Sequence, residues 1–242
     1  MCSNPAVPYI AGFARQQGRA FIFKADCDSW QCTECAERKK NQWLIRAQRG
    51  SKEIISSGMA LKFVTITSNP KLKSSAATIA VFPLAWGKLY KRLKRKTPNL
   101  QYLMILEHHK DGRIHAHMLS NCHCSKRWLK DNAAQCGFGY MADIQPVTSE
   151  RATAGYVTKY LAKSLAGMEL PPKTRRVRAS ENWYKLPENE GGIVTDDGWL
   201  TCTTKAGLWS FVERARAENL TMVNPRTGEL FDYGDACETW YQ

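Results

Sequence analysis

A β-hairpin in the middle of the chain constrains the fold more than any other feature. Apolar runs flank the Asp111-Gly112 turn signal, which predicts one strand over residues 101–107 and a second over residues 113–120. Residues two apart on a strand share a face, so His115 and His117 should lie side by side. Four of the five histidines fall within a stretch of ten residues, and two imidazoles at this spacing can bind one divalent metal ion.

The length of the turn determines which third side chain joins the two histidines. A two-residue turn pairs His108 with His115, whereas a three-residue turn over residues 110–112 pairs Glu107 with His115. We favour the longer turn, because a carboxylate is a harder ligand and suits magnesium or manganese better than a third imidazole does. The same register places His109 nearer the turn, as a reserve ligand or a phosphate contact. The predicted metal ligands are therefore Glu107, His115 and His117.

A second motif, at residues 156–163, reads Tyr-Val-Thr-Lys-Tyr-Leu-Ala-Lys and places Tyr156, Lys159, Tyr160 and Lys163 on one face of a helix. Burying lysines without partners is costly, so this face is poorly suited to a core. A tyrosine hydroxyl can attack a phosphodiester, and a neighbouring lysine can stabilise both the phenolate and the charge on the phosphate. Taken alone, the motif fits an ordinary amphipathic helix equally well.

Three motifs in this order resemble the HUH endonucleases, and among them the rolling-circle replication initiators. They are a first strand Phe-Val-Thr-Ile-Thr at residues 63–67, the His115-Ala116-His117 pair, and the Tyr156-x-x-Lys159-Tyr160 motif. The tandem tyrosines look most like those of the two-tyrosine initiators of single-stranded DNA phages and related plasmids. Ala116 departs from the family pattern, in which this residue is usually bulkier, so packing beneath the strand is expected to differ.

The resemblance implies an endonuclease and strand transferase acting on single-stranded origin DNA. The metal would polarise the scissile phosphate, and Tyr156 or Tyr160 would attack it to leave a 5′-phosphotyrosine and a free 3′-hydroxyl that can prime synthesis. An unperturbed phenol has a pKa of about 10, so Lys159 is expected to help it ionise. We expect both tyrosines to be active and Tyr156 to act first, because its relation to Lys159 also matches single-tyrosine relatives.

Two alternatives stay open. Within the same chemistry the chain could be an HUH transposase or relaxase, although its short length and tandem tyrosines favour an initiator. From a different class, it could be a nonenzymatic, zinc-containing nucleic-acid-binding regulator in which the histidines and tyrosines are structural. The chain has no Gly-x4-Gly-Lys-Ser/Thr sequence, so a fused ATP-driven helicase is excluded. The expected partners are therefore a host helicase and the host replication machinery.

The charge of the chain suits a nucleic-acid partner. Its 242 residues carry a net charge of +13, and residues 187–242 hold ten acids and four bases, so residues 1–186 carry +19. Such a basic body is expected to bind DNA with an affinity that falls steeply with salt. No apolar stretch approaches the roughly 20 residues needed to span a bilayer, and no signal segment is present. We therefore predict a soluble cytoplasmic protein that does not engage a membrane, in a bacterial host if the gene belongs to a phage or plasmid.

Two basic segments are predicted to hold the DNA backbone, together with Lys163. The first ends a helix that begins near Ala76, and the second is read as a loop after Pro171-Pro172. The residues concerned are Lys91, Arg92, Lys94 and Arg95 in the first segment and Arg175, Arg176 and Arg178 in the second. Trp183 and Tyr184 could stack on unpaired bases or pack in the core.

Cysteines near the start of the chain have metal-ligand spacing. Cys27, Cys32 and Cys35 supply three thiols, and Cys2 can supply a fourth if the chain start folds back. The Cys122-His123-Cys124 cluster is another possible source of the fourth ligand. Disulfides are disfavoured by an intracellular setting and by the odd count of nine cysteines, which leaves free buried thiols as the remaining alternative. We favour a structural zinc site. The opening Met1-Cys2 and the Cys32-x-x-Cys35 stretch are also similar to replication proteins of small microvirus-type phages.

The expected architecture is α+β. Helices are expected at residues 33–49, 76–96, 125–135 and 208–218, with Pro83 disturbing the second, and strands at residues 61–67 and 140–147 beside the hairpin. This order supports a central antiparallel β-sheet with helices packed mainly on one face, and the resemblance implies a ferredoxin/RRM-like HUH nuclease core. The expected divisions are a cysteine-rich, zinc-binding N-terminal element (1–58), the nuclease core (59–168), and a basic loop with an acidic extension (169–242). We expect the extension to pack on the nuclease, with DNA mimicry or helicase recruitment as alternatives.

Overall fold

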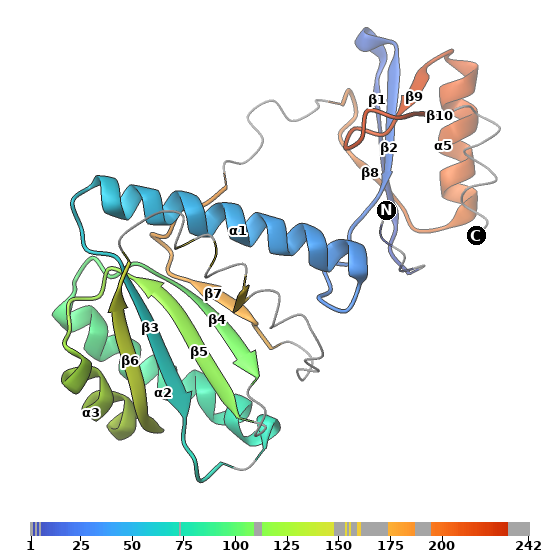
Figure 1. Ribbon diagram of the computed structural model, residues 1–242. Coiled ribbons are helices and arrows are strands. Elements are labelled where there is room, and N and C mark those ends of the chain that lie inside the picture. Colours follow the sequence, from blue (N-terminus) through green and yellow to red (C-terminus); the bar gives the residue numbers. More distant parts are fainter. Residues whose placement is uncertain are drawn as a thin grey trace. The chain divides into compact units, whose positions relative to one another are not determined.

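The computed structural model describes residues 2, 4, 6–72, 74–108, 113–147, 153, 155, 159–160, 174–186 and 195–231, with the backbone alone at His108. The chain forms two compact units, unit 1 (residues 1–39 and 187–242) and unit 2 (residues 40–186). Each unit contains its own five-stranded sheet (Figure 1). This division differs from boundaries at 58 and 168, because strands from the two ends of the chain pair with each other.

The sheet of unit 2 has the strand order β6-β3-β5-β4-β7, and every neighbouring pair is antiparallel. Its strands are β3 (Lys62–Ser68), β4 (Tyr102–His108), β5 (Ile114–Ser120), β6 (Phe138–Pro146) and β7 (Val177–Ala179). The predicted first strand, hairpin and sixth strand are therefore present within one or two residues of their expected bounds. The α+β class and the antiparallel sheet are confirmed.

Two helices cover one face of this sheet (Figure 1). They are α2 (Ser75–Lys96) and α3 (Lys126–Cys136). Alternate strand residues such as Val64, Ala116 and Met118 are buried against Leu89 of α2 and Leu129 of α3. The period of two along each strand thus sends one set of side chains into the core and leaves the other set, which includes His115 and His117, on the opposite face.

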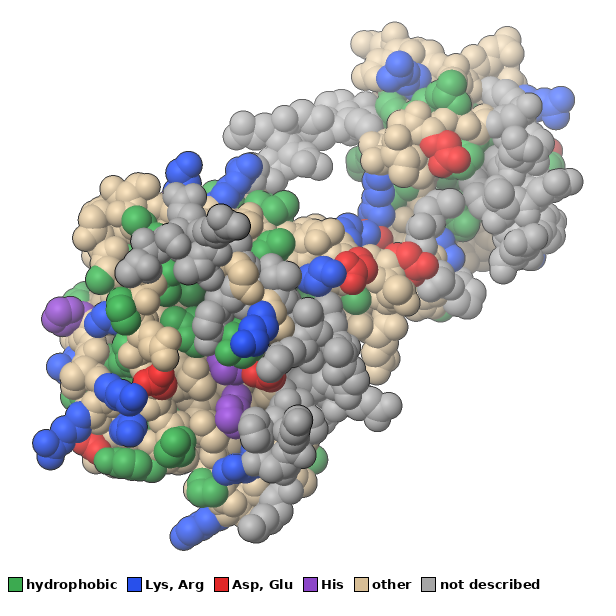
Figure 2. Space-filling model, viewed as in Figure 1, with side chains coloured by type: hydrophobic (Ala, Val, Ile, Leu, Met, Phe, Trp, Pro, Cys, Tyr) green, Lys and Arg blue, Asp and Glu red, His purple; other side chains and the backbone are tan. Residues whose placement is uncertain are grey.

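The face opposite α2 and α3 is polar at its centre. In Figure 2, histidine side chains lie beside an acidic side chain on the face of unit 2 turned to the viewer, with Lys and Arg side chains around them. Charge is divided unevenly between the units, since unit 2 holds 26 Lys and Arg against eight Asp and Glu, a net +18. Unit 1 holds nine against fourteen, a net −5. The polyanion-binding potential therefore belongs to unit 2.

Local signals at the helix ends explain where these helices begin and stop. The Ser74 and Ser125 side chains accept hydrogen bonds from Ala77 N and Trp128 N, so both helices have serine N-caps. Gly137 ends α3 in the left-handed conformation, as predicted. Helix α2 continues through Pro83 as one element, and the helix expected to end near residue 49 continues to Ser56 as α1 (Thr33–Ser56).

Unit 1 is built around an N-terminal hairpin that is not among the predicted elements. Strands β1 (Tyr9–Ala14) and β2 (Arg19–Lys24) pair antiparallel, with the 3-10 turn η1 (Arg15–Gln17) and the left-handed Gly18 between them. Two apolar runs on either side of Gly18 are the sequence signal for this hairpin. The C-terminal part of the chain supplies the rest of the sheet, in the order β10-β9-β2-β1-β8.

The C-terminal elements of unit 1 are short strands and one helix. They are β8 (Leu200–Cys202), α5 (Lys205–Ala217), β9 (Thr221–Val223) and β10 (Leu230–Phe231). Strand β8 pairs with β1, and β9 runs parallel to β2. Helix α5 covers one face, where Phe211 stacks on Phe13 with 4.4 Å between ring centroids. The acidic segment therefore completes the N-terminal sheet, which departs from the expectation that it packs on the nuclease.

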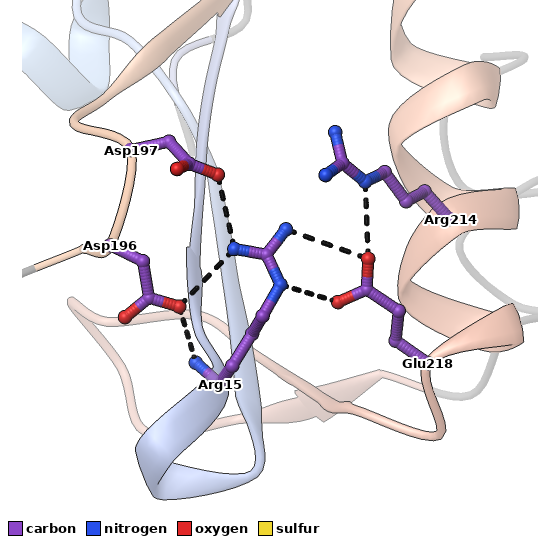
Figure 3. Close-up of polar contacts among 5 residues, drawn as sticks. All are labelled: Arg15, Asp196, Asp197, Arg214 and Glu218. Atoms are coloured by element: carbon purple, nitrogen blue, oxygen red, sulfur yellow. Dashed lines mark hydrogen bonds and ion pairs between the residues drawn. The ribbon is translucent and has the colours of Figure 1, made fainter.

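Arg15 links the hairpin turn to both C-terminal segments of unit 1 (Figure 3). Its guanidinium pairs with Asp196 at 3.3 Å, Asp197 at 3.0 Å and Glu218 at 2.6 Å. Arg214 donates a further hydrogen bond to Glu218. The contact with Arg15, followed by that with Arg214, lowers the pKa of Glu218 from its ordinary 4.5. In the described part of the chain, no helix combines the length and the apolar character needed to cross a membrane.

Candidate active site and metal centre

The register of the β4–β5 hairpin places Glu107 directly opposite His115. His108 lies opposite Ile114, so the register that would bring His108 to His115 is excluded. The prediction of Glu107 as the partner of the two histidines in the sheet is confirmed. The turn residues 110–112 and the reserve ligand His109 lie outside the described residues.

His117 is held at both ring nitrogens. It is only 6% exposed, and its Nε2 lies 2.6 Å from Oε2 of Glu107. Its Nδ1 lies 3.2 Å from Oγ1 of Thr65, the residue directly opposite it on β3. A hydroxyl can donate or accept, so Thr65 can pair with either tautomer of the imidazole. If Nε2 binds a metal, the Nδ1–H can donate to Thr65, which orients the ring.

Tyr160 lies directly on this histidine. Thr153, Gly155, Lys159 and Tyr160 are all helical, and the Tyr160 ring stacks on His117 with 3.7 Å between centroids and 28° between planes. The Lys159 ammonium nitrogen lies 5.8 Å from the centroid of the Tyr160 ring. The tyrosine motif and the histidine hairpin therefore meet at one place. Tyr156 and Lys163 lie outside the described residues.

A buried phenylalanine completes the floor of this aromatic stack. The centroid of Phe63 lies 5.9 Å from that of His117 and 5.9 Å from that of Tyr160. Phe63 and Thr65 come from the Phe-Val-Thr-Ile-Thr strand, where a spacing of two puts both on the face of the histidines. Neither was predicted as a site residue, although that alternation was the signal that could have found them.

The chemistry of the three predicted ligands suits a divalent cation. His115 shares the face of His117, with 6.3 Å between their ring centroids, and one carboxylate with two imidazoles is a common ligand set. Glu107 and His117 contact each other directly, so binding an ion here would replace their hydrogen bond. Across the described residues, the one group of three or more histidine, cysteine or carboxylate donors gathered closely enough for an ion lies elsewhere, in unit 1.

That group is a four-cysteine cluster formed by Cys2, Cys27, Cys32 and Cys35, whose sulfurs all lie within 4.8 Å of one another. The sulfurs of Cys2 and Cys32 are 3.7 Å apart, and those of Cys27 and Cys35 are 3.5 Å apart. Tetrahedral zinc with Zn–S bonds of about 2.3 Å separates its sulfurs by about 3.8 Å. The cluster could therefore hold a structural metal such as zinc, with Cys2 in the predicted position.

The surroundings of the cluster favour thiolates. Although burial opposes ionisation of Cys2, backbone hydrogen bonds at Asn4 and Cys27 and the neighbouring thiols lower its pKa to about 6. Helix α1 begins at Thr33, between Cys32 and Cys35, and a helix N-terminus stabilises nearby negative charge. The other candidate thiols, Cys122 and Cys124, are buried in the core of unit 2. The four-cysteine cluster is complete without them.

The first predicted DNA-binding segment lies at the surface of α2. Lys91, Lys94 and Arg95 are exposed. Arg92 is engaged differently, since its Nη1 donates to Asn132 at 2.8 Å and to Gln135 at 2.6 Å. Arg92 therefore links α2 to α3, and the other three side chains are accessible to DNA.

The loop predicted after Pro171-Pro172 is wrong for its last part. Val177–Ala179 forms strand β7, in which Arg178 lies opposite Met104 of β4. Burial lowers the pKa of both Arg176 and Arg178, and the Arg178 guanidinium lies 5.7 Å from the centroid of Phe82. The arginine-rich composition masked a short strand that needs β4 as its partner. Of this segment's three predicted contacts, Arg175 is exposed.

The two alternatives for Trp183 are now separated. Its side chain is 2% exposed, and its Nε1 donates to the carbonyl of Arg46 at 3.0 Å. A Cβ at Gly50 would approach its ring to 2.6 Å, so α1 carries glycine at this contact. Trp183 is a core residue. Tyr184 accepts a hydrogen bond at its hydroxyl from Arg49.

Residues 61–165 match the model of a family described as Replication-associated protein ORF2. This segment belongs to that family. The match begins at β3 and includes His115, His117 and Tyr160, so it covers the whole candidate site of the replication-associated segment. It confirms the resemblance to rolling-circle initiators that the three motifs indicated. No curated protein and no solved structure matches the chain.

Proposed function

We propose that this replication-associated protein initiates rolling-circle replication by nicking and rejoining single-stranded origin DNA with a tyrosine nucleophile. The observation that carries the proposal is the stack of Tyr160 on His117, which in turn contacts Glu107. A phenol thus lies next to a carboxylate–imidazole pair, on a unit with a net charge of +18. Phosphate chemistry on DNA needs these three elements in one place.

A divalent cation, magnesium or manganese, held by Glu107, His115 and His117 would supply Lewis-acid polarisation of the scissile phosphate. The donor set fits such an ion in chemistry, and Thr65 supports the ligand tautomer of His117. The half-buried site limits competition from bulk water around the ligands. The protein's own residues then have to position the nucleophile and stabilise its charged form.

The nucleophile is the hydroxyl oxygen of Tyr156 or Tyr160. Its attack forms a bond to phosphorus, the bond to the 3′ oxygen breaks, and the proton lost by the phenol is matched by one gained at the 3′-hydroxyl. The 5′ end stays attached to the tyrosine as a phosphodiester. Lys159, whose ammonium lies near the Tyr160 ring, would favour the phenolate. Rejoining is the reverse reaction with a new 3′-hydroxyl.

Two tyrosines allow two successive cleavages. Tyr156 would act first, and Tyr160 would cleave the regenerated origin while the first strand is still attached. Origin DNA is then released as a ligated circle. The exposed Lys91, Lys94, Arg95 and Arg175 would hold the DNA backbone, and a host helicase would unwind the duplex in the bacterial cytoplasm.

The test is covalent adduct formation on a labelled single-stranded origin oligonucleotide with manganese. Tyr156→Phe and Tyr160→Phe should each remove one adduct-forming step, and the double variant should form none. Tyr184→Phe is the matched control, because its hydroxyl is bound by Arg49 away from the site. Adducts that persist in the double variant would refute the tyrosine mechanism. Absence of EDTA-sensitive cleavage with every metal tried would favour the nonenzymatic regulator.

We also propose that Cys2, Cys27, Cys32 and Cys35 hold a structural zinc ion. Four protein ligands leave no open position for chemistry, so this ion would stabilise unit 1 and take no part in cleavage. Purified protein should contain about one zinc per chain, and Cys35→Ser should lose it. Cys136→Ser is the control, because Cys136 is buried in the core of unit 2.

A further inference from the structure

Strand β6 contains a bulge that displays two apolar side chains. Ile66 of β3 lies opposite Ala142, and Ser68 lies opposite Phe138, so Thr67 alone faces residues 139–141 of β6. Bulges of this kind occur at sheet edges and beside active sites, where they redirect side chains. Strand β6 is an edge strand of the sheet of unit 2. The extra residues therefore project from the edge.

The bulge is set by a glycine that no other residue can replace without movement. A Cβ on Gly139 would lie 2.7 Å from the carbonyl oxygen of Ser68 and 3.2 Å from that of Thr67. Because both obstacles are backbone atoms, a side chain here would push β6 away from β3. Gly139 thus lets the chain hold close to β3 while the next two residues turn outward.

Those two residues are Tyr140 and Met141, which are 58% and 69% exposed. Among the aromatic side chains that the structure describes in unit 2, Tyr140 is the one left exposed. The ammonium of Lys130 lies 5.5 Å from the centroid of its ring. An exposed ring with a neighbouring cation contributes nothing to the core, but it is the arrangement on which an unpaired base can stack beside its phosphate.

The bulge lies at the level of the candidate active site. Thr67, which faces the bulge on one side, lies opposite His115 on the other. Adjacent strands are about 4.8 Å apart, so the bulge is about 10 Å from β5 across the sheet. A nucleic-acid strand bound at the histidines can reach Tyr140 within a short length.

We propose that Tyr140, Met141 and Lys130 form a base-stacking subsite for single-stranded DNA that flanks the cleaved phosphate. Every base has an aromatic face, so this subsite would bind single strands with little sequence preference. The net charge of +18 on unit 2 favours a polyanion over a protein partner at this edge. The inference rests on the proposed function only in taking single-stranded DNA as the substrate.

The test measures DNA binding without cleavage. The full chain is titrated against a fluorescent single-stranded oligonucleotide in EDTA, and affinity is read from anisotropy. Tyr140→Ala should weaken binding between about fivefold and a hundredfold, whereas Tyr140→Trp should keep it. Leu84→Ala is the matched control, since Leu84 is 66% exposed on α2 of the same unit, and it should bind as the wild type does. Affinity for a duplex of the same sequence should not change in Tyr140→Ala.

Unchanged single-strand affinity in Tyr140→Ala would overturn the subsite, and so would an equal loss for duplex and single strand. Self-association that Tyr140→Ala abolishes, with DNA affinity intact, would assign the edge to a second copy of the chain instead. These outcomes are independent of nicking. A wild-type protein that never nicks but depends on Tyr140 for single-strand binding would refute the proposed function and leave the subsite standing.

Discussion

Thr65→Val tests whether the hydroxyl behind His117 prepares that histidine to bind a metal ion. Valine keeps the shape and the β-branch of threonine, so β3 and its pairing should persist. What changes is the hydrogen bond between Oγ1 of Thr65 and Nδ1 of His117, which measures 3.2 Å. Because His117 is 6% exposed, water is a poor substitute for the lost hydroxyl.

The size of the effect follows from this burial. A buried donor left without a partner costs about 1–3 kcal/mol, and each 1.4 kcal/mol is a factor of about ten in an equilibrium constant. This cost applies to the tautomer in which Nε2 binds metal and Nδ1 carries the proton. We therefore expect manganese affinity to fall about 10- to 100-fold, the range typical of residues that orient metal ligands.

The assay is the manganese concentration that gives half-maximal nicking of a single-stranded oligonucleotide, together with a direct manganese titration. Thr65→Ser keeps the hydroxyl and should restore the affinity. Thr78→Val is the matched control, because Thr78 is a buried threonine on α2 whose hydroxyl donates to the carbonyl of Ser75. It should lower stability without changing manganese affinity. The reasoning fails if Thr65→Val binds manganese as tightly as the wild type, or if Thr78→Val shows the same loss.

Two further predictions concern unit 1. Removing zinc with a tight chelator, or by Cys35→Ser, should lower its thermal midpoint by more than about 10 °C, since a loss of a few kcal/mol shifts a domain of this size by several degrees each; calorimetry showing no shift would argue against a structural ion. The pKa of Glu218 is lowered in the folded state by Arg15 and then Arg214, so its contribution to stability is present above pH 4.5 and is lost as pH falls through the lowered value. Glu218→Gln should therefore flatten the dependence of urea stability on pH in the acid range, and a slope as steep as that of the wild type would contradict this.

The hairpin of unit 2 could be predicted to the residue because its signals are local. The apolar alternation and the Asp-Gly turn lie within about 20 residues of chain, and the choice between two registers rested on ligand chemistry alone. The sheet of unit 1 could not be predicted in the same way. Strands β8 and β9 have three residues each, too few for a period, and they form only because a hairpin some 200 residues away offers edges to pair with.

The candidate site shows the same limit at the scale of side chains. Glu107 and His117 were predicted because carboxylates and histidines stand out by type. Thr65 was not, because threonine in a strand is ordinary and its role depends on which residue the next strand places opposite it. Arg176 and Arg178 mark the converse error, since their charge suggested a DNA-binding loop while the edge of β4 took them into a strand.

These comparisons locate the dependence of the chemistry on the core. A shift of one residue in the β4–β5 register would carry Glu107 to the other face of the sheet and leave His117 without it. The register is held by side chains that never touch the site, since Leu106, Ala116 and Met118 are buried against α2 and α3 on the opposite face. A polar substitution at Ala116 would thus act on the site through pairing rather than through contact. The small residue between the two histidines therefore belongs to the machinery that holds the ligands in place, although it binds nothing itself.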